Sequence, residues 1–219
     1  MLKVLDLFSG TGTVKRMCAE RPELYDCLAL DLAKADINCD ILEWDYTEHD
    51  HFDVIFASPP CNCFSRLKRC NIGRTLITGV HVTADSIEAD ISNIGLPILR
   101  KTEEIIRHFK PRWFFIENPQ TARTKEYLDY PFYTVDYCMY GMPYRKRTNI
   151  WTNLKQFEPL LCNKQCSGWE GRRHAKNVNE LGGGHDSTIL GGRAIRSKVP
   201  DNLIRALLNG VEAEYLTQA

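Results

Sequence analysis

The stretch ASPPCNCFS, residues 57–65, places two cysteines one residue apart, directly after a double proline and an apolar run. The prolines restrict the backbone before Cys61 and a basic stretch follows, so we expect Cys61 at a helix N-terminus that favours its thiolate. Cys61 is therefore the candidate nucleophile. The structural thiols, which we expect to be buried, are Cys18, Cys27, Cys39 and Cys63.

Two further motifs carry groups that would assist a nucleophile. FFIENPQ presents Glu117 after four apolar or aromatic residues, a setting that raises the pKa of a carboxyl group and makes it a usable proton donor. YGMPYRKRTNIW presents Arg145 and Arg147, two residues apart on one face of an expected strand, where they could orient a carbonyl or a phosphate.

A third group of residues is typical of a nucleotide site. DLFSGTGT follows the first apolar run, and its Gly10 and Gly12 permit a tight turn close to a ligand. Asp31 ends the second run, where a carboxylate can accept both hydroxyls of a ribose. Asp40 suits an adenine amino group and Ile41 the adenine ring. Each could be a plain surface acid or core aliphatic residue, but their order favours an adenosine cofactor.

Short apolar segments alternate with amphipathic ones along the chain. Residues 97–109 and 200–216 carry apolar stripes with helical spacing. The segments expected to form strands are KVLDLF, DCLALDL, FDVIFAS, RWFFIEN, YTVDYCMY and RTNIWTN, and their branched and aromatic residues are typical of buried parallel strands. This alternation predicts an α/β fold with a doubly wound sheet, whose ligands bind at the carboxyl ends of the strands.

The length of 219 residues suits one domain, or one domain with a small appendage. We expect the main domain to comprise residues 1–153 and 197–219, with a small, loop-rich insertion at 154–196. That insertion contains cysteines and histidines whose spacing permits a zinc knuckle, which would let so short a segment fold. The alternative is two core thiols and two solvated histidines. The residues concerned are Cys162, Cys166, His174 and His185.

Charge is balanced overall, with 28 basic and 28 acidic residues, so only its distribution bears on a polyanionic partner. Residues 61–84 carry four basic residues and no acid, and residues 154–198 carry eight basic residues against four acids. Residues 31–53 hold eight carboxylates. Two basic loops in a neutral chain fit a phosphate-binding surface better than a merely solvated face.

Nine cysteines, an odd number, with no signal peptide before the first strand argue against a secreted disulfide framework. No apolar run approaches the roughly 20 residues that cross a bilayer. We therefore expect a soluble intracellular protein without a membrane partner, in the cytoplasm or at the nucleoid. Its origin stays open and includes a virus or a phage.

In chain order, the motifs DLFSGTG, SPPCN, FIENP, YGMPYRKR and SKVPDNLIRA resemble those of the DNA (cytosine-5-)-methyltransferase family over nearly the whole chain. The resemblance implies a Rossmann-like, S-adenosylmethionine-dependent enzyme that acts as a monomer on double-stranded DNA. It implies that Cys61 attacks carbon 6 of cytosine while Glu117 protonates ring nitrogen 3, with Arg145 and Arg147 beside the base. The cofactor residues would be Phe8, Gly10, Gly12, Asp31, Asp40, Ile41 and Pro60. The nucleic-acid contacts would be Asn62, Arg66, Lys68 and Arg69.

The sequence departs from the family pattern in its details and in its size. Asn62 replaces the usual Gln, Pro119 the usual Val and Ser197 the usual Asn, and Tyr144 stands where Gln and one further residue usually precede the arginines. Family members commonly carry a long target-recognition region where this chain has the insertion at 154–196. The short insertion therefore predicts a short or degenerate recognised sequence, because fewer side chains can reach base edges.

Three alternatives share the expected cofactor site. A tRNA cytosine-5 methyltransferase would use the same residues, and the sequence leaves it open. A catalytically silent nucleic-acid-binding or cofactor-sensing protein is disfavoured by the presence of Cys61 and Glu117. A methyltransferase for exocyclic amino groups would need an aromatic residue in place of Cys61.

Overall fold

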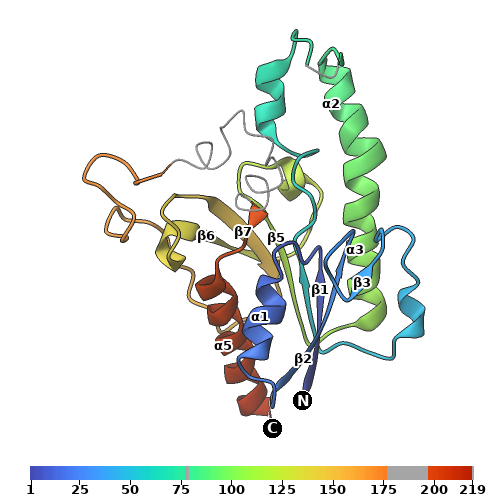
Figure 1. Ribbon diagram of the computed structural model, residues 1–219, viewed down its shortest axis with the longest axis vertical. Coiled ribbons are helices and arrows are strands. Elements are labelled where there is room, and N and C mark those ends of the chain that lie inside the picture. Colours follow the sequence, from blue (N-terminus) through green and yellow to red (C-terminus); the bar gives the residue numbers. More distant parts are fainter. Residues whose placement is uncertain (77–78, 177–196, 219) are drawn as a thin grey trace.

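A computed structural model describes residues 1–76, 79–176 and 197–218 of the chain. Its centre is a seven-stranded sheet with the order β3-β2-β1-β4-β5-β7-β6 (Figure 1). Strands β1 to β5 run parallel, whereas β7 is antiparallel to both β5 and β6. The strands are β1 (Leu2–Leu7), β2 (Tyr25–Asp31), β3 (Ile37–Asn38), β4 (Val54–Ala57), β5 (Trp113–Pro119), β6 (Phe132–Asp136) and β7 (Arg147–Thr152).

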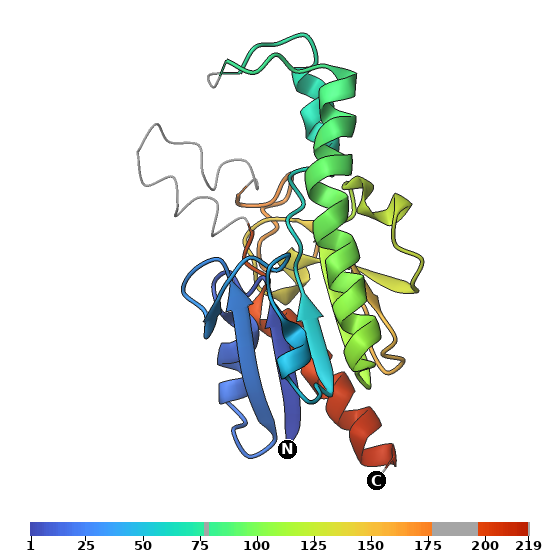
Figure 2. The same cartoon turned by 90° about the vertical axis from the view of Figure 1, so that its right-hand side faces the viewer.

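Helices cover both faces of the sheet, as predicted for a Rossmann-like α/β fold. Helices α1 (Thr13–Ala19) and α5 (Asp201–Gln218) pack together on one face, and a longer helical rod covers the other (Figures 1 and 2). That rod joins α2 (Ala84–Asp90), the π-helical turn η3 (Ile91–Gly95) and α3 (Leu96–Phe109). The 3-10 turns are η1 (Tyr46–Glu48), η2 (Arg66–Asn71), η4 (Arg123–Glu126) and η5 (Tyr137–Tyr140).

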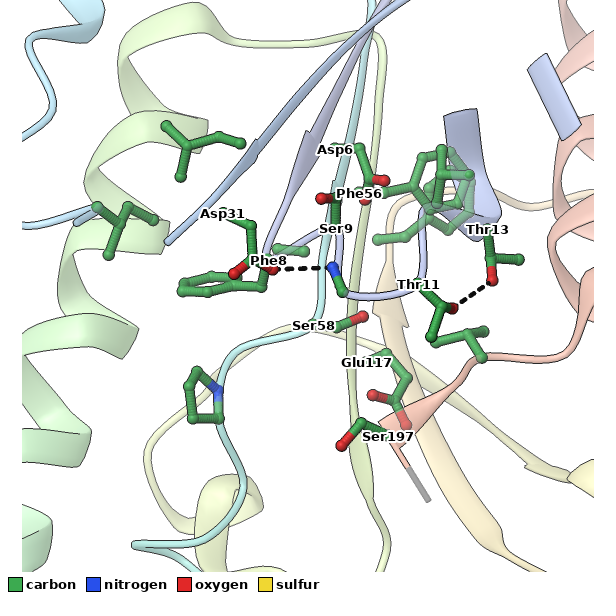
Figure 3. A pocket seen from close by; sticks show the side chains of 18 of the residues that line it. Asp6, Phe8, Ser9, Thr11, Thr13, Asp31, Phe56, Ser58, Glu117 and Ser197 are labelled. Atoms are coloured by element: carbon green, nitrogen blue, oxygen red, sulfur yellow. Dashed lines mark hydrogen bonds between the residues drawn. The ribbon is translucent and has the colours of Figure 1, made fainter. Parts of the chain in front are cut away.

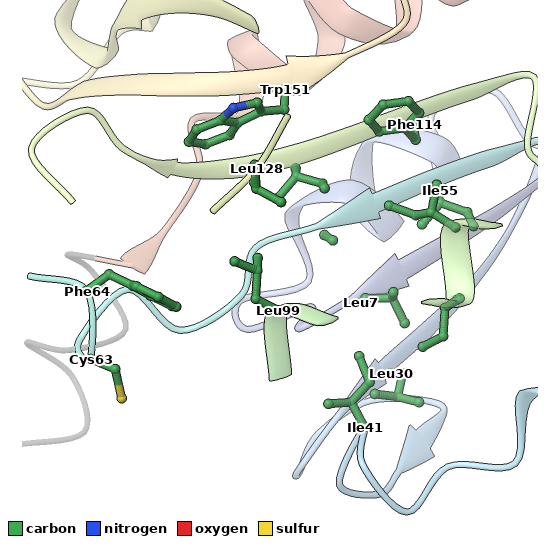
Figure 4. Close-up of a cluster of buried hydrophobic side chains, with 14 of the residues drawn as sticks. Leu7, Leu30, Ile41, Ile55, Cys63, Phe64, Leu99, Phe114, Leu128 and Trp151 are labelled. Atoms are coloured by element: carbon green, nitrogen blue, oxygen red, sulfur yellow. The ribbon is translucent and has the colours of Figure 1, made fainter. Parts of the chain in front are cut away.

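Strand β1 shows how the sequence builds a core on each side of the sheet. Successive side chains of a strand point to opposite faces. Leu5 and Leu7 therefore pack under α3 (Figure 4), while Leu2 and Val4 join α1 and α5 in a second cluster. With both faces covered, the central strands read as continuous apolar runs rather than as alternating ones.

The sequence predictions are wrong at one edge of the sheet. YTVDYCMY is not a single strand, because β6 ends at Asp136 and Tyr137–Tyr140 form η5. The strands β6 and β7 are antiparallel rather than parallel, since only residues 137–146 join them and a parallel crossover needs about a dozen residues or more. The two-residue strand β3 was not predicted.

The π-helical turn places the helical rod against the segment that follows β4. A Cβ atom at Gly95 would lie 2.9 Å from the Phe64 ring and 3.0 Å from the Cβ of Cys63. Only glycine therefore lets the helix approach this segment without displacing it. The segment that carries Cys61 therefore packs against the helical rod at Gly95.

Residues 154–176, the described part of the expected insertion, contain no helix or strand beyond an isolated bridge between Trp169 and His174. Their irregular structure agrees with the sequence analysis, whereas the domain division itself stays a prediction. Within the described ranges, no helix is long and apolar enough to cross a membrane.

Candidate active site

A cavity of about 460 Å³ opens at the carboxyl edge of the sheet, between the segments that follow β1 and β4. In such sheets the strand order reverses at this point, and ligands bind there. Figure 3 shows the carboxyl groups of Asp6, Asp31 and Glu117 around it. The predicted residues that line it are Phe8, Gly10, Asp31, Asp40, Ile41, Pro60 and Glu117.

The glycine-rich turn after β1 is shaped by left-handed backbone. Gly10 has φ +54°, Gly12 φ +67° and Phe8 φ +61°. A non-glycine residue rarely adopts this conformation, and it costs on the order of 1–3 kcal/mol. Phe8 is thus strained where it lines the cavity. Gly12 is not among the lining residues; it stands at the start of α1.

Asp31 ties this turn to the end of β2. Its Oδ2 accepts a hydrogen bond from the backbone N–H of Gly10 (2.8 Å), and its Oδ1 accepts one from that of Leu32 (2.7 Å). Each carboxylate oxygen has a second lone pair for a ligand hydroxyl. Asp40 and the buried Ile41 line the cavity after β3, so the predicted ribose and adenine residues share one wall.

Asp6 is a lining residue that sequence reasoning missed. It is 4% exposed, and its Oδ2 has no hydrogen-bond partner within the described chain. Burial, with a smaller contribution from the charge of Asp31, raises the pKa of Asp6 to about 8. Asp6 therefore favours its protonated form at neutral pH. An acid inside the apolar run LKVLDLF was the available signal.

Cys61 lies in the turn after β4 and is half-buried. The expectation of a helix N-terminus is wrong, because the next helical segment, η2, begins only at Arg66. Burial raises the pKa of the Cys61 thiol, the nearby Lys146 ammonium lowers it, and Glu117 raises it again, so the net direction is upward. Lys146, rather than a helix, is thus the group that favours the thiolate. Cys61 does not line the cavity, although its neighbour Pro60 does.

The expected burial of the other cysteines is confirmed for Cys18 and Cys63, which are 1% and 4% exposed. Cys27 and Cys39 are only partly buried, packed against the two cores. Cys63, unlike Cys61, belongs to the core under α3 (Figure 4).

Glu117 lies on β5, 9% exposed, between a phenol and an ammonium group. Its Oε1 accepts a hydrogen bond from Tyr137 Oη (2.7 Å) and lies 3.4 Å from Lys146 Nζ. Both contacts hold the carboxyl group through the same oxygen. Sequence reasoning missed Lys146, and its position between the two predicted arginines was the available signal.

Asn118 links the Glu117 strand to the Cys61 turn. It is 1% exposed, its Nδ2 donates to the carbonyl oxygen of Pro59 (2.8 Å), and its Oδ1 accepts from Thr124 Oγ1 (2.8 Å). The asparagine of FIENP therefore sets the distance between the two predicted catalytic segments. Sequence reasoning gave it no role.

Arg145 and Arg147 meet on one carboxylate, that of the fully buried Asp136. Arg147 binds it through two nitrogens (3.0 and 2.8 Å) and Arg145 through Nε (3.1 Å). Burial alone would raise the pKa of Asp136, but hydrogen bonds from Arg147, Cys162 N–H and Arg145 hold that pKa below its usual value. The prediction that Arg145 and Arg147 share one face of a strand is wrong, because β7 begins at Arg147 and Arg145 precedes it.

The expected nucleic-acid residues lie on the segment that runs from the Cys61 turn to α2, which projects beyond the sheet (Figures 1 and 2). Asn62, Arg66 and Arg69 are exposed. Arg66 lies 3.8 Å from Glu126, and Lys68 is paired more closely with Asp90 (2.7 Å). Lys68 is thus engaged within the protein.

Three of the four expected zinc residues, Cys162, Cys166 and His174, lie together. His185 lies outside the described residues. Within the described chain the fourth member of the cluster is Cys138, on η5, which sequence reasoning did not include because it is distant along the chain.

No protein-family model matches the chain. The chain is 42% identical over 221 residues to a probable DNA (cytosine-5)-methyltransferase of Frog virus 3 (isolate Goorha), covering 95% of this chain and 99% of that protein. Among solved structures, Entamoeba histolytica EhMeth matches with a TM-score of 0.48 at 15% identity, over 86% of this chain and 62% of that one. The S. pombe Dnmt2 methyltransferase matches with a TM-score of 0.45 at 15% identity, over 83% and 59%. By its similarity to the viral protein over almost the full length of both, the chain belongs to the DNA (cytosine-5-)-methyltransferase family.

Proposed function

We propose that the protein transfers a methyl group from S-adenosylmethionine to carbon 5 of cytosine in double-stranded DNA through a covalent Cys61 adduct. The observation that carries the proposal is the grouping of Cys61, Lys146 and Glu117 beside the cavity. There the Lys146 ammonium lowers the pKa of the Cys61 thiol, and the Glu117 carboxyl group raises it. A nucleophile and a proton donor are the two groups that carbon-5 chemistry on cytosine requires.

The cavity residues fit the cofactor that the family uses. Asp31 presents lone pairs for ribose hydroxyls, Asp40 and Ile41 suit adenine, and Phe8 supplies an aromatic wall. The carboxyl group of Asp6, whose Oδ2 has no partner within the described chain, offers a further polar group in the same wall. When bound, S-adenosylmethionine supplies an electrophilic methyl group.

The residues of the chain would act in sequence on a cytosine turned out of the duplex, because a stacked base is beyond their reach. The Cys61 thiolate forms a bond to carbon 6, ring nitrogen 3 takes a proton from Glu117, and the pair of electrons becomes available at carbon 5. After carbon 5 is methylated, a base removes its proton, the bond between sulfur and carbon 6 breaks so that the Cys61 thiolate leaves, and ring nitrogen 3 returns its proton to the Glu117 carboxylate.

Lys146 assists the first of these steps. Burial alone would keep the Cys61 thiol protonated, and the ammonium group opposes that effect. The same Lys146 Nζ lies 3.4 Å from Glu117 Oε1, so one ammonium group contacts the predicted proton donor and acts on the predicted nucleophile. Asn118 connects the Glu117 strand to the Cys61 turn through its hydrogen bond to the carbonyl oxygen of Pro59.

A projecting segment beside Cys61 supports DNA as the substrate, as does the similarity to the probable DNA (cytosine-5)-methyltransferase of Frog virus 3. Exposed Arg69 and Arg74 stand there with the exposed apolar side chains of Ile72, Leu76 and Val80. Cationic groups contact phosphates, and apolar groups can enter a base stack that is being opened.

The test is a covalent trap. The methylated site is first located by bisulfite sequencing of DNA from cells that express the protein. Duplex DNA with 5-fluorocytosine at that site, together with S-adenosylmethionine, should give a protein–DNA species that survives denaturing electrophoresis, because fluorine cannot be removed as a proton.

Two serine variants distinguish the thiols. Cys63→Ser should still form the adduct, and Cys61→Ser should fold and bind S-adenosylmethionine without forming it. The reverse result would move the nucleophile to Cys63. Methyl transfer to tRNA but not to duplex DNA would replace the proposed substrate with RNA, the alternative left open by the sequence.

A further inference from the structure

Three thiols and one imidazole converge where β6 ends, outside the catalytic groups described above. The potential ligand atoms of Cys138, Cys162, Cys166 and His174 all lie within 4.8 Å of one another. The Sγ atoms of Cys162 and Cys166 are 3.8 Å apart, and Cys162 Sγ lies 3.4 Å from His174 Nε2. Cys138 is buried and the other three are partly buried.

The two shortest of these separations, between Cys162 Sγ and Cys166 Sγ and between Cys162 Sγ and His174 Nε2, are close to those of a tetrahedral zinc site. Zinc–sulfur bonds of about 2.3 Å and zinc–nitrogen bonds of about 2.0–2.1 Å place neighbouring sulfur atoms about 3.8 Å apart, and sulfur and nitrogen about 3.6 Å apart. A disulfide would need about 2.05 Å between the sulfur atoms, and all the cysteines are free. We propose that Cys138, Cys162, Cys166 and His174 bind one structural zinc ion.

Four protein ligands leave no open position for a reacting water molecule, which indicates a structural rather than a catalytic ion. The three thiols would lose their protons to solvent on binding, and His174 would bind through Nε2 as a neutral imidazole.

The segment that supplies three of the ligands needs such a crosslink. Within residues 163–174 the described backbone–backbone hydrogen bonds are all local, among them those from Trp169 N–H to Cys166 O (3.0 Å) and from Glu170 N–H to Arg173 O (2.8 Å). Gly168 is the single buried residue of this stretch. A metal ion can replace the hydrophobic core that so short a segment lacks.

Cys138 joins this segment to the arginine side of the active site. It follows Asp136 by two residues, and Asp136 Oδ2 accepts a hydrogen bond from the Cys162 N–H (2.8 Å) as well as from Arg147. Farther along, Lys176 N–H donates to Pro143 O (3.1 Å). The ion would therefore fasten residues 162–176 to the loop that carries the arginines, a positioning role independent of the proposed reaction.

The first experiment measures metal content in tag-free protein purified without chelator. Elemental analysis should find one zinc per chain in the wild type, in Cys70→Ser, whose thiol is exposed and outside the cluster, and in His185→Ala. Cys138→Ser should retain much less. Full zinc in Cys138→Ser with loss in His185→Ala would overturn the assignment of Cys138.

A second measurement does not depend on variants that lose a ligand. Cobalt(II) in place of zinc should give the intense ligand-field bands of tetrahedral geometry together with thiolate-to-metal charge-transfer absorption. His174→Cys should keep both and increase the charge-transfer absorption by about a third, from three thiolates to four. A weak octahedral spectrum without charge-transfer bands would overturn the proposal.

Chelation provides the structural readout. Hydrogen exchange should accelerate at the amides of Cys162 and Lys176 after zinc removal, whereas the amides of β1 should keep their protection. Unchanged exchange at Cys162 and Lys176 after complete removal of zinc would contradict the positioning role.

Discussion

The two halves of the sheet edge hold their site residues by different means. On the side of β1 and β2, backbone geometry dominates, with left-handed turns at Phe8 and Gly10 and with Asp31 accepting backbone N–H groups. On the side of β5, β7 and β6, side chains hold one another, as in the pairs of Glu117 with Lys146 and of Asp136 with Arg147.

This difference separates two functions. A site made from backbone tolerates side-chain changes elsewhere, whereas a site made from charged pairs changes whenever one partner is removed. Substitutions on the side of β5, β7 and β6 should therefore lower kcat and leave the affinity for S-adenosylmethionine unchanged. Substitutions on the side of β1 and β2 should weaken that affinity and leave kcat unchanged.

The largest predicted effect of a single substitution is at Glu117. Glu117→Gln should reduce kcat by about 100- to 10,000-fold, the usual range for general acid catalysis, because an amide does not donate the required proton. Calorimetric titration should show an unchanged Kd for S-adenosylmethionine. A kcat within a factor of a few of wild type would remove Glu117 from the mechanism, and a parallel loss of cofactor affinity would show that the two halves are not separate.

The counterpart on the backbone side is Asp31. Asp31→Ala should weaken S-adenosylmethionine binding by about 10- to 100-fold, the range expected when a hydrogen-bonding charged group is lost. Asp31→Asn, which keeps an acceptor for the Gly10 N–H, is the matched control and should lose less. Equal affinity of Asp31→Ala and the wild type, measured by calorimetry, would make the ribose assignment wrong.

Lys146 should control the pH at which the Cys61 thiol ionises. Burial raises the pKa of the Cys61 thiol and Lys146 lowers it, so Lys146→Met should raise that pKa further. The rate of Cys61 alkylation, followed by mass spectrometry of its peptide, should then begin to rise at a higher pH than in the wild type. Lys146→Arg keeps the charge and should leave the profile nearly in place. Coincident profiles for Lys146→Met and wild type would exclude Lys146 as the activating group.

The last effect concerns the pH dependence of stability on the cofactor side. Because the pKa of Asp6 is raised to about 8 in the folded chain, its contribution to stability is full below its unfolded pKa near 4 and is lost as the pH rises through about 8. One such group changes the free energy of unfolding by up to about 1.4 kcal/mol per pH unit.

Asp6→Asn should lack this component. Urea unfolding between pH 4 and pH 8 should therefore show a shallower decline of the free energy of unfolding than in the wild type. Parallel curves for the two proteins would mean that Asp6 is ionised within the fold.

Much of the fold followed from local pattern, because strand and helix periodicities depend on neighbouring residues. KVLDLF, RWFFIEN and the stripe at 97–109 were recognised in this way, and they correspond to β1, β5 and α3. The site motifs could also be recognised locally, because each lies at the end of an apolar run. Phe8, Asp31, Pro60 and Glu117, which were predicted in this way, line the cavity.

Contacts between distant residues were decided only by the tertiary structure. Asp136 meets Arg147 and Cys162, and Cys138 meets His174, across separations that no periodicity encodes. The antiparallel edge and the absence of a helix at Cys61 were likewise missed, because they depend on how the chain returns to the sheet. The sequence alone determined which chemical groups are available, since residue types and strand ends are local properties. Their charge states and partners arise from burial and from neighbours distant in the chain, which exist only after folding.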